Sequence, residues 1–170
     1  MLLRPARMDD VPTLTRWDAM PHVVSATGDD DVIDWESDIA ADPPWRQILV
    51  AERDGRPIGV VQIIDPAEEE THYWAGAEPH LRAIDIWIGE AAYLRQGHGT
   101  QMMRLALARC FADPEVDAVV IDPLVANAAA IRFYRRLGFA YVEDRWFGAD
   151  HCAVHRLDRA RWVAAAADAV

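Results

Sequence analysis

The stretch that decides the fold is a strand followed by a glycine turn and the start of a helix: Ile84-Asp85-Ile86-Trp87-Ile88-Gly89 and, shortly after it, Arg95-Gln96-Gly97-His98-Gly99-Thr100. The apolar residues of the first part predict a buried strand over Leu81–Gly89. The apolar residues after the turn recur with helical spacing and predict an amphipathic helix over Gly99–Phe111.

The turn between these two elements has the chemistry of an anion site. Gly97 and Gly99 let the backbone approach a ligand closely and adopt conformations that other residues resist. The free N–H groups and the dipole of a helix start attract negative charge, and Arg95 adds a positive charge. A diphosphate would fit here, although Gly-x-Gly before a helix is equally compatible with an ordinary tight turn.

Two other phosphate sites are excluded by the residues present. The third glycine of a dinucleotide-binding motif would fall at Met102, and the chain has no lysine for a P-loop. All 17 basic residues are arginines, against 28 acidic residues, which gives a net charge of −11. This charge argues against nucleic acid as a partner and suits a small cationic amine substrate, but acidity for solubility alone explains it equally well.

The elements around the turn predict a single α/β domain over residues 1–170 with a mixed sheet. Asp9 is expected to cap a first helix that contains Pro12. In a second helix, the residues expected to face inward are Ile33, Ser37 and Ala40. Strands are expected at Leu2–Ala6, Gln47–Arg53, Pro57–Ile64, Val116–Ile121, Phe139–Trp146 and Cys152–Leu157, helices at Val32–Ala41, Asn127–Leu137 and after Asp158, and a long loop at Asp65–His80.

No apolar run approaches the roughly 20 residues that cross a bilayer, and Met1–Pro5 has no export-signal pattern. We therefore expect a cytoplasmic protein without membrane contact, either a monomer or a homodimer. Cys110 and Cys152 are expected to be reduced and buried. The six histidines lack the spacing of a zinc site, so no metal is expected.

With these features together, the sequence resembles the GCN5-related N-acetyltransferase (GNAT) superfamily. Gly97-His98-Gly99-Thr100 is similar to the core of its Gln/Arg-x-x-Gly-x-Gly/Ala pyrophosphate loop, and the segment from Asn127 through Tyr134 to Phe139 is similar to its Asn…Tyr…Gly-Phe segment. One departure is Leu94, where the superfamily has Gln or Arg. Because backbone N–H groups hold most of the diphosphate, we expect cofactor binding to survive this change.

The resemblance, from Leu2 to about Leu157, implies a GNAT fold: a mixed, mostly antiparallel central sheet flanked by helices, with a splayed strand pair for acyl-CoA. It implies acetyl-CoA as co-substrate and direct acetyl transfer to an amine in a ternary complex. The cofactor contacts that it implies are Trp87, Ile88, Arg95, Gln96, Gly97, His98, Gly99, Thr100 and Asn127. Among these, the backbone N–H groups of Trp87 and Ile88 would polarise the thioester carbonyl.

Two residues are candidates for catalysis. Asp85 would orient the incoming amine and accept or relay its proton, with Ile84 and Ile86 expected to desolvate it and raise its pKa. An ion pair with Arg82 is the alternative role for this carboxylate. The resemblance implies that Tyr134 protonates the departing thiolate; without it, a tyrosine in an apolar helix is a core residue by default.

The closest likeness is to bacterial aminoglycoside 6′-N-acetyltransferases, whose Val-Arg-Gly-Ile-Asp strand resembles Leu81–Asp85 and which share the leucine at the loop's first position. The expected acceptor is therefore the 6′ amine of an aminoglycoside antibiotic, which would link the chain to antibiotic resistance. The expected substrate-binding residues are Glu70, Tyr73, Trp74, Asp85 and Asp122. For Asp122, a turn-initiating role is an equally good alternative.

The acceptor is less well determined than the reaction. Pro21–Trp45 lacks the aromatic pair that shapes the antibiotic pocket of close relatives, and Ala26-Thr27-Gly28 stands near that place. A different antibiotic, a small metabolite or a protein N-terminus is therefore the alternative acceptor. Trp35, Trp45 and Trp146 fit either a core or a lid, and Glu68 and Glu69 are expected on a solvated loop. A non-catalytic acyl-CoA-binding module would be expected to lack Asp85 or Tyr134, and both are present.

Overall fold

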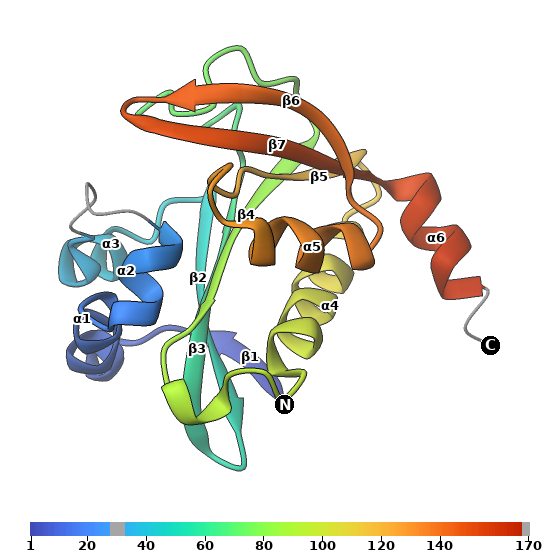
Figure 1. The fold of residues 1–170 in the computed structure, drawn as a ribbon. Helices are drawn as coiled ribbons and strands as arrows, with labels where there is room; N and C mark the ends of the chain where they lie inside the picture. Colours follow the sequence, from blue (N-terminus) through green and yellow to red (C-terminus); the bar gives the residue numbers. More distant parts are fainter. Residues whose placement is uncertain (28–32, 168–170) are drawn as a thin grey trace.

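A computed structural model describes residues 1–27 and 33–167 of the chain as a single sheet with helices on both faces. Helices α4 and α5 cover one face, while α1, α2 and α3 lie on the other side (Figure 1). The last helix, α6, extends from the end of the sheet (Figure 1). The predicted α/β class with a mixed, mostly antiparallel sheet is confirmed.

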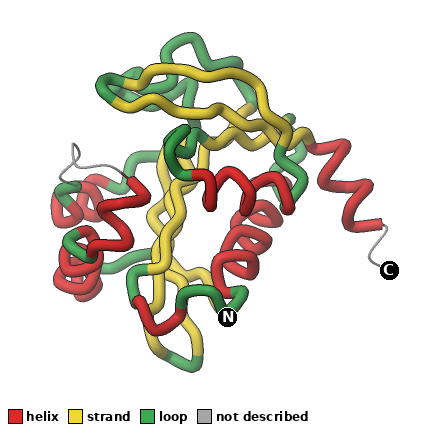
Figure 2. Tube along the Cα trace, viewed as in Figure 1, coloured by secondary structure: helices red, strands yellow, loops and turns green. Residues whose placement is uncertain are grey.

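The strands are β1 (Leu2–Pro5), β2 (Arg46–Arg53), β3 (Arg56–Ile64), β4 (Leu81–Ile88), β5 (Ala118–Ile121), β6 (Ala140–Phe147) and β7 (Asp150–Asp158). The helices are α1 (Val11–Asp18), α2 (Pro21–Thr27), α3 (Trp35–Ala41), α4 (His98–Phe111), α5 (Ala128–Arg136) and α6 (Arg159–Ala167), with short 3-10 turns η1 (Met8–Asp10) and η2 (Ala91–Tyr93). The predicted loop at Asp65–His80 contains turns but no helix or strand (Figure 2).

The sheet order is β1-β2-β3-β4-β5-β7-β6, and β4–β5 is the parallel pair. These two strands are in register only where Leu81–Ala83 lie opposite Ala118–Val120. Beyond that point β4 continues to Ile88 against β3 alone, while β5 pairs with β7. The two strands therefore separate in the middle of the sheet, which leaves one edge of β4 open (Figure 1).

The core on the α4 side places Met102, Met103 and Leu107 against the apolar side chains of β3 and β4. On the opposite side, Trp17 of α1 packs where β4 ends. A Cβ atom added to Gly89 would lie 1.9 Å from a ring carbon of Trp17, so only glycine fits there. This close approach ties α1 to the end of β4.

The N-terminal region corrects several expectations. Helix α2 was not predicted, and the predicted second helix begins at Trp35, with Val32 outside the described residues. Ser37 and Ala40 are exposed, whereas Ile33 packs against the core as predicted. The reason is that α3 faces the core with Trp35. This residue is 1% exposed, so it is a core residue and not a lid.

Asp9 does not cap the first helix. Its neighbour Asp10 is the buried acid at this place, because its carboxylate accepts hydrogen bonds from the Arg7 N–H, at 2.8 Å, and from the Arg4 guanidinium. Pro12 stands in the first turn of α1 as predicted.

Cys110 and Cys152 are free and buried, as predicted. Burial raises the pKa of each thiol to about 12, so both stay protonated at neutral pH. Within residues 1–27 and 33–167, no helix has the length and apolar character needed to cross a membrane.

Candidate active site

The open edge of β4 offers backbone groups of alternate residues. In an antiparallel pair, every second residue turns its N–H and C=O towards the partner strand. The Gly89 N–H donates to the Ile58 carbonyl, at 3.0 Å, and Trp87 lies opposite Val60 in the same register, so the polar groups of Trp87 face β3. Those of Ile86 and Ile88 face the open edge. The Trp87 N–H therefore faces β3, and the N–H groups of Ile86 and Ile88 face the open edge.

The glycine turn has the geometry expected of an anion site. Gly97 has φ +82° and stands directly before α4, and Arg95, which is exposed, has φ +58°. The first helical hydrogen bond runs from the Gln101 N–H to the Gly97 carbonyl, so the N–H groups of residues 98–100 begin the helix without intrahelical partners. These residues fit a diphosphate through backbone groups and one arginine.

Three side chains of the predicted cofactor site have structural partners. His98 is 3% exposed, with its ring 5.4 Å from that of Tyr93 and its Nδ1 atom 3.4 Å from an Arg53 nitrogen, so it can meet an anion only through its backbone. The Gln96 side chain donates to the Ala92 carbonyl. The side-chain oxygen of Asn127 caps α5 by accepting from the Ala130 N–H, at 3.0 Å.

Asp85 projects from β4 on the face opposite to α4 and is half-buried. Side chains alternate along a strand, so Ile84 and Ile86 point to the α4 side and do not surround this carboxylate as predicted. Arg82 points to the α4 side of the strand, as Ile84 and Ile86 do. There it binds the carboxylates of Asp65, at 2.8 Å, and Asp113, at 3.4 Å. The ion pairs of Arg82 are therefore with Asp65 and Asp113.

Tyr73 and Asp122 form the most specific contact of the site. The Tyr73 hydroxyl donates to the Asp122 carboxylate at 2.6 Å, across 49 positions of sequence. Burial raises the pKa of the Asp122 carboxyl above its usual range, and this hydrogen bond partly opposes the rise. The Tyr73 ring stacks on Phe147 with centroids 4.5 Å apart, which holds the long loop beside the β6–β7 hairpin (Figure 2).

Tyr134 of α5 is 8% exposed and lies within electrostatic reach of both carboxylates. Burial, followed by the negative charges of Asp85 and Asp122, raises the pKa of the Tyr134 phenol above its usual value. The phenol is therefore neutral at physiological pH and carries its proton. Asp85, Asp122 and Tyr134 come from β4, from the end of β5 and from α5, and the fold brings them together where β4 and β5 separate.

The other loop residues have different positions from those expected. Glu69 is buried, because its carboxylate accepts hydrogen bonds from the N–H groups of Thr71 and Tyr73, so the prediction of a solvated side chain is wrong. Glu68 and Glu70 are exposed. Trp74 is 7% exposed and packs edge-on against Tyr73 and Phe147, so it supports the loop from the core.

Two further residues near the site were not predicted from the sequence. His22 of α2 contacts the Ile88 carbonyl through its Nε2 atom, at 2.9 Å. Asp150, at the start of β7, adds negative charge near Asp122. Neither carries a local motif, and only the pairing of distant segments brings them to β4 and β5. Of the two ambiguous tryptophans, Trp45 is half-buried and Trp146 is 66% exposed on the edge strand.

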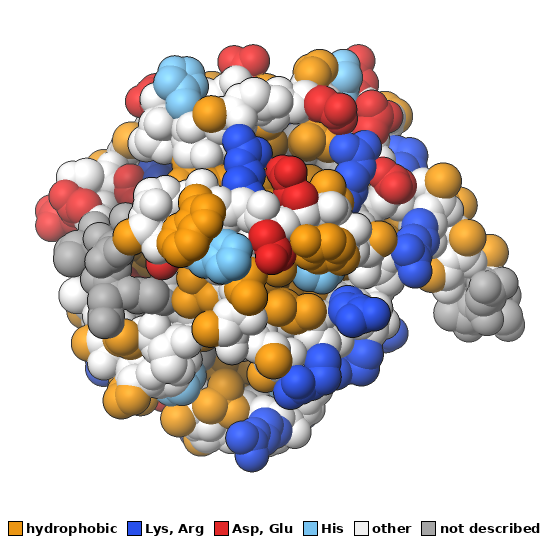
Figure 3. Space-filling model, turned by 45° about the horizontal axis from the view of Figure 1, so that its top comes forward, with side chains coloured by type: hydrophobic (Ala, Val, Ile, Leu, Met, Phe, Trp, Pro, Cys, Tyr) orange, Lys and Arg blue, Asp and Glu red, His pale blue; other side chains and the backbone are white. Residues whose placement is uncertain are grey.

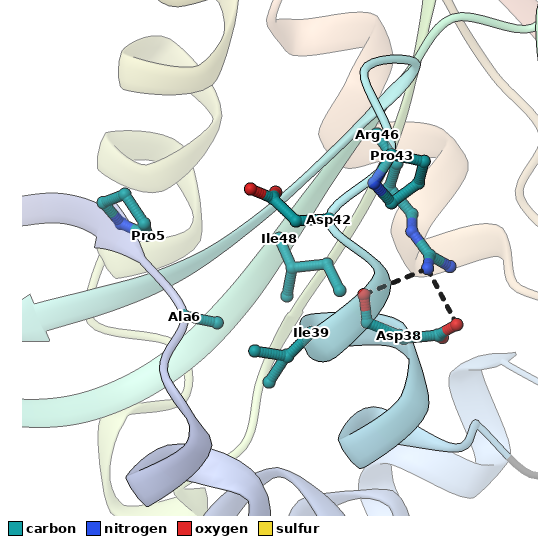
Figure 4. Close-up of a pocket in the computed structure, with 8 residues that line it drawn as sticks. All are labelled: Pro5, Ala6, Asp38, Ile39, Asp42, Pro43, Arg46 and Ile48. Carbon is teal, nitrogen blue, oxygen red and sulfur yellow. Dashed lines mark hydrogen bonds and ion pairs between the residues drawn. The ribbon is translucent and has the colours of Figure 1, made fainter.

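One face of the molecule is seen in Figure 3. Acidic side chains lie over its upper part with several arginines among them, and further arginines lie along its lower right side. A separate hollow between β1, α3 and the start of β2 contains the Arg46–Asp38 ion pair, at 2.7 Å, and none of the predicted site residues (Figure 4). Among the described residues, no group of three His, Cys, Asp or Glu side chains is placed to hold a metal ion.

Comparison with known proteins gives a family match. The model of the family described as acetyltransferase (GNAT) domain matches residues 6–147. An aminoglycoside N(6')-acetyltransferase type 1 of Klebsiella pneumoniae is 34% identical over 91 residues, which are 53% of this chain and 45% of that protein. A kanamycin resistance protein of Rhizobium radiobacter is 39% identical over 72 residues, 42% of this chain and 61% of that protein. The chain thus matches about half the length of these curated relatives.

Solved structures share the fold over nearly the whole chain. The aminoglycoside acetyltransferase AAC(6')-Ib, in complex with coenzyme A and kanamycin, has a TM-score of 0.85 at 24% identity and covers 95% of this chain and 96% of its own. An uncharacterized protein of Bacillus halodurans has a TM-score of 0.86 at 20% identity, covering 98% of this chain and 88% of its own. At these identities the likeness establishes the fold.

Proposed function

The chain belongs to the GNAT acetyltransferase family, and from this premise we propose that it transfers acetyl from acetyl-CoA to a primary amine of an aminoglycoside, at the 6′ position. The observation that carries the proposal is the group formed by Tyr73, Asp85, Asp122 and Tyr134 beside the open edge of β4. It combines carboxylates for a cationic amine with a neutral phenol for a leaving group.

Acetyl-CoA would be held at two places. Its diphosphate would accept hydrogen bonds from the N–H groups of residues 97–100, with Arg95 adding charge. Its extended pantetheine arm would pair with the open edge of β4, at the N–H groups of Ile86 and Ile88 and the C=O group of Ile86. The thioester would then lie between Asp85 and Tyr134. Supporting this placement, only the short η2 segment separates the end of β4 from the turn, so both anchors stand on one short piece of chain.

Transfer then needs only groups of this chain and the two substrates. Asp85 orients the ammonium group and accepts its proton, so that the neutral nitrogen can attack the thioester carbonyl carbon. The Ile88 N–H, or that of Ile86, polarises the carbonyl oxygen. The carbon–sulfur bond breaks as the amide forms, and the thiolate takes the proton of the Tyr134 hydroxyl. The Tyr134 phenolate then recovers the proton that the new amide nitrogen loses, and the proton on Asp85 passes to solvent. This is direct transfer in a ternary complex.

The acceptor assignment rests on charge and on the relatives. Asp122, together with Asp150, would bind further ammonium groups of a polycation, and Tyr73 offers an aromatic ring beside them. Glu70 is exposed on the same loop and would contribute from the rim. The curated relatives named above act on aminoglycosides or confer kanamycin resistance, according to their names.

A second acceptor class is favoured by one observation. The α2–α3 region offers no exposed aromatic side chain among its described residues, because Trp35 is buried against Trp87, with ring centroids 6.0 Å apart. A smaller amine, such as a different antibiotic, a metabolite or a protein N-terminus, would need no aromatic wall there.

The test is acetyl-CoA turnover, followed by thiol release, with kanamycin, tobramycin, gentamicin, kasugamycin and spermidine as acceptors. Turnover with an aminoglycoside bearing a 6′ amine, and acetylation at that nitrogen by mass spectrometry and NMR, is the expected result. Saturable acetyl-CoA binding without turnover on any aminoglycoside would exclude this acceptor class and leave the second one.

A further inference from the structure

One contact on the open edge of β4 comes from a helix with no predicted role. The Nε2 atom of His22 lies 2.9 Å from the Ile88 carbonyl oxygen. Because a carbonyl can only accept, Nε2 carries the hydrogen and donates it. His22 is half-buried on α2, and the contact spans 66 positions of sequence.

This bond completes the anchoring of one peptide unit. The peptide between Ile88 and Gly89 is held on one side by His22, through its C=O, and on the other by the Ile58 carbonyl, which accepts from the Gly89 N–H at 3.0 Å. Gly89 is also pressed against Trp17. Immediately after this unit, the chain leaves the sheet and runs through η2 to the glycine turn.

The anchored peptide therefore lies between the two places proposed to hold acyl-CoA. On one side is the open edge with the Ile86 and Ile88 N–H groups, and on the other is the turn at residues 95–100. A ligand that spans both gains affinity when the protein holds the two in a constant relation before binding, because less order is lost on association. The peptide plane at Ile88 sets the direction in which the chain leaves the edge.

We propose that His22 is a positioning residue for acyl-CoA: its hydrogen bond to the Ile88 carbonyl holds the end of β4 so that the open edge and the glycine turn are aligned for one extended ligand. This inference rests on the proposed placement of acetyl-CoA. It gives α2 a role towards the co-substrate, although α2 lies on the side of the sheet opposite to α4 and α5 (Figure 1).

A simpler role for His22 would be to hold α2 against the sheet. A neighbouring residue provides a control that separates this role from the proposed one. Val23, the next residue on the helix, is 2% exposed and packs into the core without taking part in the hydrogen bond. Val23→Ala loosens the docking of α2 and leaves the His22 side chain intact. His22→Leu removes the donor at similar volume, whereas His22→Gln keeps an N–H donor of similar reach.

The experiment measures acetyl-CoA affinity by calorimetry, KM for each substrate, and the thermal midpoint of all four proteins. A net hydrogen bond contributes about 0.5–1.5 kcal/mol, so His22→Leu should bind acetyl-CoA about two- to thirteenfold more weakly. The acceptor KM should stay unchanged. His22→Gln should recover most of the loss, and Val23→Ala should lower the thermal midpoint while keeping wild-type acetyl-CoA affinity.

Three results would overturn the inference. His22→Leu could bind acetyl-CoA as tightly as wild type or more tightly, the latter meaning that His22 competes with the ligand. Val23→Ala could reproduce the loss, which would reduce His22 to docking α2. His22→Gln could fail to recover binding. In each of these cases the proposed function remains supported as long as the wild-type protein binds acetyl-CoA. A wild-type protein that binds no acetyl-CoA would refute both the proposed function and the role of His22.

Discussion

Replacing Tyr73 by Phe tests the electrostatics of the site with the smallest change. The substitution removes the hydroxyl that donates to Asp122 at 2.6 Å and keeps the ring that stacks on Phe147 at 4.5 Å. A hydrogen bond to a charged group contributes about 1.5–3 kcal/mol, and one pKa unit corresponds to about 1.4 kcal/mol. Because Asp122 is not fully shielded from water, the lower end of this range applies, and we expect its pKa to rise by about one unit.

The direction follows from the causes of the pKa shift at Asp122. Burial raises the pKa of this carboxyl and the Tyr73 hydroxyl lowers it, so loss of the hydroxyl raises it further. A protonated Asp122 no longer attracts a cationic acceptor. The acid limb of the kcat/KM profile for the acceptor should therefore move to higher pH by about one unit in Tyr73→Phe, with the plateau at high pH nearly unchanged.

The assay is initial-rate kinetics with varied acceptor between pH 5 and 9, at saturating acetyl-CoA. Tyr141→Phe is the matched control, because Tyr141 also donates to a carboxylate, that of Asp144 at 3.2 Å, but on the exposed strand β6. Its profile should coincide with that of wild type. An acid limb of Tyr73→Phe that stays in place or moves to lower pH would refute the role given to this hydrogen bond.

Three other substitutions follow from the same geometry. Asp85→Asn should lower kcat far more than it weakens acetyl-CoA binding, which calorimetry and steady-state rates distinguish; equal activity would remove Asp85 from catalysis. Tyr134→Phe should slow kcat less, because water can protonate the thiolate, and a solvent isotope effect on kcat should then change. Gly89→Ala places a methyl group 1.9 Å from the Trp17 ring and should cost about 3 kcal/mol, or roughly 6–12 °C in Tm. Gly99→Ala, whose nearest neighbour would lie at 3.8 Å, should melt close to wild type.

Several features depend on short stretches of chain and could be predicted. The strand before the turn, Gly97 at the start of α4 and the helix that begins after Asn127 all follow from residues within a few positions of one another. Local signals of this kind need only helix starts, glycine conformations and apolar periodicity. The GNAT resemblance then extended them to a family, which the match over residues 6–147 confirmed.

The expectations that the structure corrected concern which face of a strand a side chain occupies and which strand its backbone groups pair with. Asp85 was expected to be desolvated by its sequence neighbours, but a strand sends those to the opposite face. Trp87 was expected to offer its N–H to the ligand, but the register with β3 turns this N–H towards β3 and leaves the N–H groups of residues one position away at the open edge. Both outcomes depend on which strand lies alongside β4.

The sequence by itself therefore determined that a glycine turn and a helix follow a buried strand, and it predicted an anion site at the turn and roles for Asp85 and Tyr134 in acetyl transfer. Tertiary structure decided where β4 and β5 separate, that Tyr73 reaches Asp122, and that His22 meets the Ile88 carbonyl. The physical reason is distance along the chain. A turn or a cap is stabilised by neighbouring residues, whereas these contacts join segments 49 and 66 positions apart and form only when the sheet is assembled.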